Sequence, residues 1–272
     1  MYDEILDASR QFFKLGLKQK MALAPRHFSP TNVNRYRGYF PLTSGNHAFK
    51  EGFEVGWQHY QKTGSSLLFD EVSVWPGQAL TSDWENLLKR YFEAQLKVGL
   101  CLLKAFEYHF ELPVDQLTKQ FQNTLSTLRL LRYPALDDTV DTSSLENDNT
   151  RFYTTPTHTD SGILTLLLQD ESGGLEVKHA SGRWVAAPPV KGTLVMNIGD
   201  LLERWTNGAF RATEHRVQAP TGARYSVPFF LEPGPNAVIT PFNGESQTAP
   251  VTYHSYLSDK ISSFVEYQSE TT

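Results

Sequence analysis

The hydrophobic pattern of the chain changes once, and this change constrains the fold more than any other feature. Up to about residue 122 the apolar residues recur at helical spacing or are separated by loops. Beyond that point they form short runs rich in β-branched and aromatic residues, with Gly and Pro between the runs. Many short strands of this kind are typical of a sandwich or a barrel. We therefore expect a mainly β fold with flanking helices.

Four segments carry helical signals, whereas residues 21–80 are rich in Pro, Gly and aromatic residues and are predicted to be long ordered loops with short extended pieces. The longest helix has an N-cap candidate, Ser82, with Glu85 three residues later. A shorter one starts with a proline, which suits the first helical position. The predicted helices are Asp3–Lys20, Ser82–His109, Pro113–Gln120 and Thr252–Glu266.

The second half of the chain contains seven predicted strands and neither a repeat nor a linker. The strands are Thr127–Tyr133, Ile163–Gln169, Leu175–Lys178, Trp184–Ala187, Thr193–Ile198, Arg211–Gln218 and Tyr225–Leu231. We expect one domain over residues 1–272. It consists of a mostly helical and loop region at 1–122, a β core at 123–235 and a C-terminal extension with a helix at 236–272.

Charge and composition narrow the class of partner. The net charge of −5 argues against a duplex nucleic-acid binder, because such proteins neutralise phosphates with Lys and Arg. The N-terminus is acidic and has no long apolar run, so neither a signal peptide nor a membrane span is predicted. Cys101 is the only cysteine, and its apolar neighbours predict burial. We expect a cytoplasmic, monomeric protein that binds a small molecule.

Two potential metal ligands, His158 and Asp160, lie two residues apart, and in an extended segment their side chains point to the same face. His215 lies in another predicted strand. Two imidazoles and one carboxylate form the facial triad of non-haem iron(II) oxygenases. A zinc hydrolase can use the same ligand types. A His-x-Asp pattern is also common by chance, and a lone histidine is more often a surface or hydrogen-bonded core residue.

Arg224 and Ser226 are again two residues apart in a predicted strand. A guanidinium fork and a hydroxyl on one face are suited to holding a carboxylate by charge-assisted hydrogen bonds. An isolated arginine can also simply cover a sheet face. A zinc hydrolase would leave this pair unexplained, so the pair favours the oxygenase interpretation of the triad.

Several blocks in one order resemble the isopenicillin N synthase-like family of iron(II)- and 2-oxoglutarate-dependent dioxygenases, and the resemblance covers nearly the whole chain. The blocks are Arg10-Gln11-Phe12-Phe13 with Lys20, Arg37-Gly38-Tyr39, Leu130-Leu131-Arg132-Tyr133-Pro134, Pro156-Thr157-His158-Thr159-Asp160, Gly173-Gly174-Leu175, Asn197-Ile198-Gly199-Asp200, Thr206-Asn207-Gly208, Thr213-Glu214-His215-Arg216-Val217 and Arg224-Tyr225-Ser226-Val227.

The resemblance implies a double-stranded β-helix, a cupin-like jelly roll, with the iron site in the 123–235 core. By the same resemblance, the metal ligands are His158, Asp160 and His215. Arg224 and Ser226 match the pair that binds the distal carboxylate of 2-oxoglutarate, and Tyr133 matches a tyrosine near this co-substrate. The asparagine that relatives often carry two positions before that tyrosine is Leu131 here.

The implied function is an oxygenase that uses iron(II), 2-oxoglutarate and O2, with ascorbate as the reductant in vitro. It would hydroxylate, desaturate or oxidatively cyclise a small molecule, with formation of succinate and CO2, and secondary metabolism is the expected setting. No catalytic residue beyond the metal ligands is predicted. Two alternatives stay open: an iron(II)-dependent oxidase or cyclase that does not use 2-oxoglutarate, and a non-enzymatic jelly-roll protein that binds a ligand.

The substrate pocket is predicted to combine aromatic residues with an arginine, so that an apolar or aromatic body and an acid would both fit. Aromatic residues are more often core than pocket, and arginines are usually solvated. Among the arginines, Arg132 is the best candidate because it lies between Leu131 and Tyr133. The candidate substrate-binding residues are Arg132, Tyr153, Phe152, Arg151, Tyr39 and Phe230.

Overall fold

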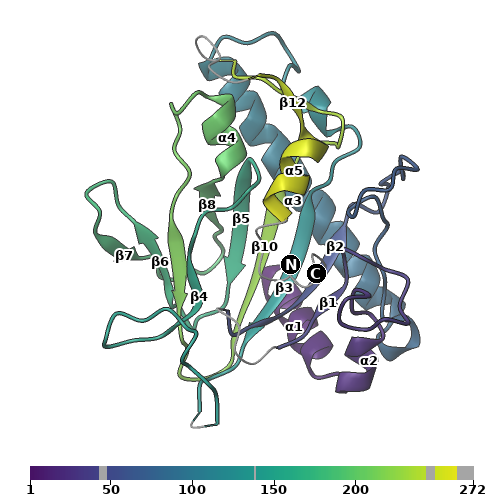
Figure 1. The fold of residues 1–272 in the computed structure, drawn as a ribbon, viewed down its shortest axis with the longest axis vertical. Helices are drawn as coiled ribbons and strands as arrows, with labels where there is room; N and C mark the ends of the chain where they lie inside the picture. Colours follow the sequence, from purple (N-terminus) through teal and green to yellow (C-terminus); the bar gives the residue numbers. More distant parts are fainter. Residues whose placement is uncertain (43–47, 138, 243–248, 262–272) are drawn as a thin grey trace.

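The computed structural model describes residues 1–42, 48–137, 139–242 and 249–261. Its centre consists of two antiparallel sheets (Figure 1). The larger sheet has the strand order β1-β2-β3-β10-β5-β8, and the smaller one has the order β4-β9-β6-β7. Leu131 and Tyr133 of the larger sheet pack against Leu175 and Val217 of the smaller one. The two sheets therefore face each other, as the jelly-roll prediction requires.

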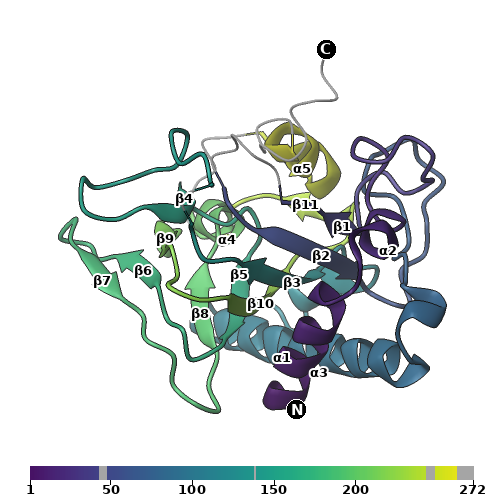
Figure 2. The same cartoon turned by 90° about the horizontal axis from the view of Figure 1, so that it is seen from below.

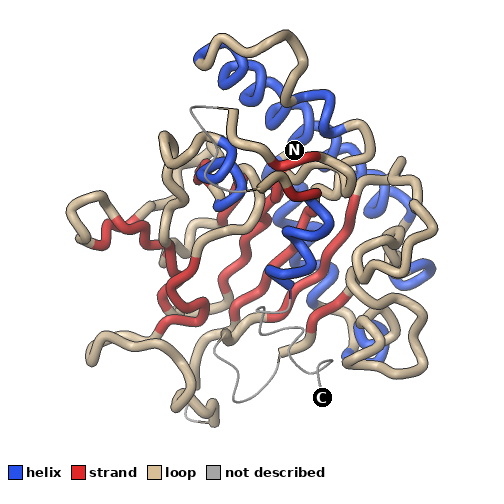
Figure 3. Tube along the Cα trace, turned by 45° about the horizontal axis from the view of Figure 1, so that its top comes forward, coloured by secondary structure: helices blue, strands red, loops and turns tan. Residues whose placement is uncertain are grey.

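The larger sheet contains the longest strands, which cross the centre of the molecule as neighbouring segments (Figure 3). Its members are β1 (Tyr39–Phe40), β2 (Glu51–Gly56), β3 (Thr127–Tyr133), β10 (Arg224–Leu231), β5 (Leu164–Gln169) and β8 (Val195–Ile198). The smaller sheet comprises β4 (Tyr153–His158), β9 (His215–Gln218), β6 (Leu175–Lys178) and β7 (Trp184–Ala186). A separate pair is formed by β11 (Val238–Ile239) and β12 (Val251–Thr252).

Helices cover the outer face of the larger sheet. Figure 2 shows α1 (Tyr2–Phe13) and α3 (Ser82–His109) on one side of β2 and β3, with α5 (Tyr253–Ile261) on the opposite side. Aromatic contacts fix this layer, since the Phe12 and Phe53 ring centroids lie 4.3 Å apart and those of Phe92 and Phe229 lie 5.0 Å apart. The shorter helices are α2 (Leu17–Met21), α4 (Asp200–Trp205), and the 3-10 turns η1 (Gly77–Ala79) and η2 (Thr118–Phe121).

The predicted β fold with flanking helices is confirmed, but several boundaries differ. The helix predicted over Asp3–Lys20 is two helices that flank Gly16, whose extended backbone interrupts the helical path. The helix predicted after Pro113 is only the 3-10 turn η2. The last helix ends at Ile261 among the described residues, and the remainder of the predicted Thr252–Glu266 segment lies outside them.

Several elements were not among the predicted helices and strands, including β4, β11 and η1. Strands β1 and β2 lie inside the segment 21–80, for which loops with short extended pieces were predicted, and α4 follows Gly199, where only a strand exit was expected. All six residues of β2 are buried, so the strand lacks the alternation of apolar and polar residues that marks a half-exposed strand. Its pairing with β3 holds it in the sheet.

Cys101 is exposed, so the prediction that it is buried was wrong. It lies on α3, whose buried positions include Leu96, Gly99 and Leu103. The helical period places Cys101 off that buried stripe, although its immediate neighbours are apolar. In the part of the chain that the structure describes, no helix has the length and apolar character needed to cross a bilayer.

Strand alternation divides the larger sheet into two chemically different faces. On β3, Leu128 and Leu130 belong to the core beneath the helices, whereas Leu131 and Tyr133 point toward the smaller sheet. We call the latter side of the sheet its inner face. Because Ser226 pairs with Leu131 in the register of β10 and β3, Ser226 also belongs to the inner face.

A buried carboxyl group lies just beyond the end of β10. Burial raises the pKa of Glu232 to about 7, and the neighbouring Arg37 only partly offsets that rise. Between about pH 4.5 and pH 7 this side chain is therefore mostly protonated in the native state, whereas it is mostly ionised in the unfolded chain.

Replacing Glu232 with Gln should remove a pH-dependent loss of stability. Because the native pKa of Glu232 is raised from 4.5 to about 7, its contribution is most favourable below pH 4.5 and declines up to pH 7. Glu232→Gln should thus gain roughly 2.5 kcal/mol at pH 8 relative to pH 5, compared with the unmodified chain. Urea unfolding of both proteins at the two pH values measures this difference. Glu214→Gln, at an exposed carboxylate, is the control, and equal gains in the two variants would contradict the expectation.

Candidate active site

Three potential metal ligands meet between the two sheets. His158 ends β4, His215 begins β9, and these two residues are register partners. Asp160 Oδ1 lies 3.8 Å from His158 Nε2 and 3.7 Å from His215 Nε2. One ligand atom from each residue lies within 4.8 Å of the others. The geometry therefore brings the predicted triad together from two strands and one loop.

Backbone carbonyls orient both imidazole rings. His158 Nδ1 lies 2.8 Å from the Pro156 carbonyl oxygen, and His215 Nδ1 lies 2.9 Å from the Thr213 carbonyl oxygen. A carbonyl can only accept, so each Nδ1 carries the proton and donates it. The lone pair is then on Nε2 in both rings, which is the atom that faces Asp160.

The two oxygens of Asp160 have different partners. Oδ2 accepts hydrogen bonds from Thr165 Oγ1 at 2.5 Å and from Asn197 Nδ2 at 2.8 Å. Oδ1 faces the two imidazoles instead. This arrangement fixes the carboxylate plane and reserves one oxygen for a cation, as supporting hydrogen bonds commonly do in metal sites.

Gly199 allows the loop that holds Asp160 to pack against the start of α4. A Cβ atom at this position would lie 2.2 Å from the Gly162 carbonyl oxygen and 2.9 Å from that of Asp160. The next residue, Asp200, donates its backbone N–H to the Asp160 carbonyl at 2.8 Å. The sequence suggests one extended segment through both His158 and Asp160, but Asp160 follows the end of β4 and is held by this packing instead of a strand ladder.

The protonation states suit a divalent cation. Burial is the main cause that lowers the pKa of His158 to about 4, and the neighbouring His215 ring contributes. Burial alone would raise the pKa of Asp160, but the two histidines and the hydrogen bonds from Thr165 and Asn197 outweigh it and hold the pKa below its ordinary value. At neutral pH the site thus offers a neutral imidazole and a carboxylate, the forms that bind metal.

Arg224 and Ser226 form the second predicted group, on the inner face of β10. Both side chains are buried, and Arg224 Nη1 lies 3.2 Å from Ser226 Oγ. Arg224 Nε donates to the Gly173 carbonyl at 2.7 Å, which fixes the direction of the guanidinium. A buried, oriented guanidinium beside a hydroxyl is the arrangement that recognises a carboxylate.

Tyr133 lies beside this pair, since the Arg224 guanidinium is 4.7 Å from the centre of its ring. Burial would raise the pKa of Tyr133, but the positive charges of Lys50 and Arg224 hold it below its ordinary value. The buried hydroxyls of Thr155, on β4, and Ser226 also face the Tyr133 phenol and help to lower its pKa. The positive charges of Lys50 and Arg224 around Tyr133 favour an anionic group here.

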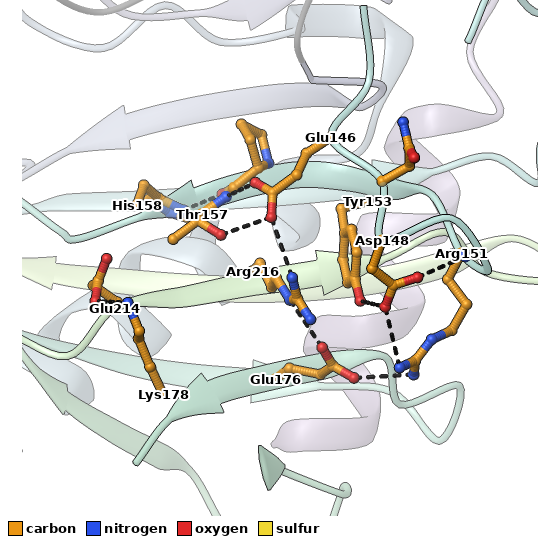
Figure 4. Close-up of polar contacts among 12 residues, drawn as sticks. Glu146, Asp148, Arg151, Tyr153, Thr157, His158, Glu176, Lys178, Glu214 and Arg216 are labelled. Carbon is orange, nitrogen blue, oxygen red and sulfur yellow. Dashed lines mark hydrogen bonds and ion pairs between the residues drawn. The ribbon is translucent and has the colours of Figure 1, made fainter. Parts of the chain in front are cut away.

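A charged network supports the outer side of the smaller sheet (Figure 4). The Arg216 guanidinium lies between the rings of Tyr153 and Trp184, at 3.8 and 4.1 Å from their centres. It donates to Glu176 at 2.9 Å and to Glu146 at 3.2 Å. Glu146 also accepts from the backbone N–H and the hydroxyl of Thr157. The residues adjacent to His158 and His215 are thereby tied together.

The structure does not bring every predicted substrate residue to this group. Arg132 and Tyr39 both bind Glu51, at 2.6 Å each, and Arg132 lies on the opposite face of β3 from Tyr133. Tyr153 donates its hydroxyl to Asp148, and Arg151 binds Glu176, both within the network of Figure 4. The exposed Phe152 precedes β4. Phe230 shares the inner face of β10 with Ser226, and it alone of the six is brought beside the triad by register.

Sequence reasoning missed the residues that orient Asp160. Thr165 is one residue into β5, and its position opposite Phe230 on β10 shows that it faces inward. Asn197 belongs to a block that was interpreted as architecture. Both have side chains that can donate to a carboxylate, but only the strand register reveals which carboxylate they meet.

The donor set fits an iron(II) site of the facial-triad type: two imidazoles and one carboxylate converge, and Arg224 and Ser226 lie on the inner face of β10. The fold and the site therefore define a class of non-haem metal oxygenases. Residues 126–233 match the sequence profile of the 2OG-Fe(II) oxygenase superfamily.

Similar proteins agree with this class. A Dictyostelium discoideum protein named "probable iron/ascorbate oxidoreductase" is 30% identical over 91% of this chain and 72% of its own length. The 2-oxoglutarate-dependent dioxygenase caaD of Aspergillus niger is 34% identical over 83% of this chain and 68% of its own. The crystal structure of a full-length Neurospora crassa protein in complex with alpha-KG has a TM-score of 0.77 at 25% identity, covering 95% of this chain and 80% of that one.

The chain belongs to the 2OG-Fe(II) oxygenase superfamily. The predicted enzyme class is confirmed: the protein is an iron(II)- and 2-oxoglutarate-dependent oxygenase, with O2 as the other co-substrate. A small-molecule substrate is consistent with this family.

Loss of the hydrogen bond from Asn197 should weaken metal binding. Asn197→Ala removes one of the two hydrogen bonds to Asp160 Oδ2 and leaves only the one from Thr165, so the carboxylate plane is held less firmly and Oδ1 is less well oriented toward the cation. We expect metal affinity to fall about tenfold to a hundredfold, as is common when such supporting groups are removed. Titration calorimetry with manganese(II) measures the affinity without turnover. Met196→Ala, at an exposed neighbour on the same strand, is the control, and an affinity within twofold of the unmodified chain in Asn197→Ala would refute the role.

Proposed function

We propose that His158, Asp160 and His215 are the residues that hold the iron. The observation that supports this assignment is that the two oxygens of Asp160 have different partners. Oδ2 accepts hydrogen bonds from Thr165 and Asn197, while Oδ1 faces the Nε2 atoms of His158 and His215. Iron(II) bound there would supply, with 2-oxoglutarate and oxygen, the oxidation of a substrate carbon coupled to formation of succinate and CO2. Two fixed tautomers and one fixed carboxylate plane keep the ligand atoms in place during turnover.

Arg224 and Ser226, with Tyr133 beside them, are proposed to bind the distal carboxylate of 2-oxoglutarate. The guanidinium is buried, so its hydrogen bonds to a carboxylate form without competition from water. Nε donates to the Gly173 carbonyl at 2.7 Å, while the Nη atoms make only longer contacts, to Ser226 Oγ at 3.2 Å and to Gln169 Oε1 at 3.4 Å, which a carboxylate could replace or share. The positive charges of Arg224 and Lys50 around Tyr133 favour an anion at this position.

All of these groups come from one chain, so we also propose that the protein acts as a monomer and as one oxygenase domain over residues 1–272. The cytoplasm is the proposed location, because iron(II) and the exposed Cys101 thiol both stay reduced there. The fungal relatives named as 2-oxoglutarate-dependent dioxygenases support hydroxylation, desaturation or oxidative cyclisation of a secondary metabolite as the reaction.

His158→Ala should abolish turnover of 2-oxoglutarate. With iron(II) and ascorbate, the unmodified chain should form succinate from 2-oxoglutarate even without its substrate, at a slow uncoupled rate. The variant loses one of three ligand atoms, so at least a hundredfold decrease in succinate formation is expected. His59→Ala removes an exposed histidine and serves as the control. Equal turnover in His158→Ala and His59→Ala would contradict the assignment of His158 as an iron ligand.

Arg224→Gln should raise the KM for 2-oxoglutarate at least tenfold with a smaller change in kcat, because a charge-assisted contact to the co-substrate is lost. Metal affinity should stay within twofold, since Arg224 contacts none of the three ligands in the described structure. The same assay addresses the rival in which the pair holds a substrate carboxylate. If that rival is right, 2-oxoglutarate has no effect on substrate oxidation, and Arg224→Gln does not change the KM for 2-oxoglutarate.

A further inference from the structure

The loop at residues 160–163 leads from the triad aspartate into β5, and we call it the Asp160 loop. Each of its four carbonyl oxygens accepts a hydrogen bond. Three of the donors are backbone N–H groups at the start of α4: Asp200 donates to Asp160 at 2.8 Å, Gly199 to Ile163 at 2.9 Å and Leu201 to Gly162 at 3.1 Å. The fourth donor is the hydroxyl of Tyr256 on α5, which lies 3.0 Å from the Ser161 carbonyl oxygen. Helix α5 therefore holds the residue next to Asp160 directly.

A second side chain of α5 reaches the same loop through α4, which lies beside α5 (Figures 1 and 2). Lys260 Nζ lies 2.6 Å from Asp200 Oδ2, and Asp200 is the residue whose backbone N–H donates to the Asp160 carbonyl. Tyr256 and Lys260 are four residues apart on α5, so they share one face of the helix. The Lys260 ammonium lies 5.9 Å from the centre of the Tyr256 ring. The two side chains thus act on the Asp160 loop from one place.

We propose that Tyr256 and Lys260 are positioning residues for the metal ligand Asp160, so that docking of α5 and binding of a metal ion at the triad stabilise each other. This inference rests on the proposed function, since it assumes that Asp160 is a ligand. Both side chains act through the backbone, at the Ser161 carbonyl and at the residue that bonds to the Asp160 carbonyl.

The position of Asp160 in the fold explains why its loop needs this support. Asp160 follows the end of β4, so no strand ladder fixes its backbone. Thr165 and Asn197 fix only the carboxylate of its side chain. A ligand group has to be held within about 0.5 Å of its productive position by its surroundings. The carbonyl contacts of the Asp160 loop supply that restraint on the main chain.

Tyr256 should contribute more to this restraint than Lys260. The Tyr256 side chain is buried, and burial together with the charge of Asp200 raises the pKa of its phenol, so the hydroxyl stays protonated and can donate. The Lys260 and Asp200 side chains are 37% and 22% exposed. Water screens such an ion pair, which therefore contributes less than a buried contact.

Thermodynamic linkage makes the proposal testable from both ends. If docked α5 strengthens metal binding, bound metal must stabilise the docked helix by the same factor. A helix that only covers the apolar core would stabilise the fold equally with and without metal. The metal affinity of α5 variants and the local stability of α5 with and without metal therefore separate a positioning role from a structural one.

Tyr256→Phe keeps the ring and removes the hydroxyl. We expect its affinity for manganese(II), measured by titration calorimetry, to fall about threefold to tenfold, and that of Tyr256→Phe with Lys260→Met to fall about tenfold to thirtyfold. The matched controls are Tyr60→Phe, which removes a buried hydroxyl bonded to Asp70, and Lys89→Met, which breaks the ion pair with Glu85. Both controls should stay within about twofold of the unmodified chain, because their contacts lie outside the Asp160 loop.

Amide hydrogen exchange of α5, followed by mass spectrometry on the full chain with and without manganese(II), measures the reverse effect. We expect the metal to slow exchange within residues 253–261 at least about threefold in the unmodified chain and in Tyr60→Phe. This slowing should disappear in Tyr256→Phe with Lys260→Met. The comparison in the unmodified chain requires no variant, so it tests the coupling even where a substitution prevents folding.

Equal exchange of α5 with and without bound metal overturns the inference. An affinity of Tyr256→Phe within about twofold of that of Tyr60→Phe overturns it as well. The proposed function is tested separately by His158→Ala, since manganese(II) binding by this variant with the affinity of the unmodified chain would refute the metal site itself. When the unmodified chain binds the metal and His158→Ala does not, a missing effect on α5 refutes only the positioning role of Tyr256 and Lys260.

Discussion

The alternation of side chains along β3 and β10 is the constraint on which the rest of the site depends. These two strands pair through Arg224 with Tyr133 and through Ser226 with Leu131, so the proposed clamp and its tyrosine share one face. The opposite face packs beneath α1 and α3. A slip of one residue would move Arg224 into that apolar layer, where a buried charge without a partner is costly. Packing of the apolar outer face thus fixes the strand register, and the register determines which side chains lie on the inner face.

The smaller sheet meets a different requirement, because both of its metal-binding histidines lie near strand ends. Arg216 follows His215, Thr157 precedes His158, and Glu146 bonds to both Arg216 and Thr157. A buried ion-pair network of this kind contributes little net stability, since desolvation offsets the attraction. Its value here is geometric: it fixes the register of β4 against β9 at a place where β4 contains bulges. The ring separation of the two histidines follows from that register.

Much of the fold and of the site could be predicted from the sequence, because their signals are local. The His158 and Asp160 spacing, the Arg224 and Ser226 spacing, and the ordered blocks need no knowledge of pairing. The roles of Thr165 and Asn197 could not be predicted in this way, since they depend on which strands become neighbours. The bounds of strand β2 could not be predicted for a related reason, since a fully buried strand shows no alternation.

Arg129 and Arg132 illustrate what local reasoning can still recover. Both lie on a strand that the sequence predicts, both have a glutamate partner on β2, and both keep part of their side chain exposed. Proximity in sequence to Tyr133 favours Arg132, but the period of two along a strand places Arg129, four residues before Tyr133, on the same face. The period of two follows from the geometry of the strand backbone, and it places Arg129 on the inner face and Arg132 on the face beneath the helices.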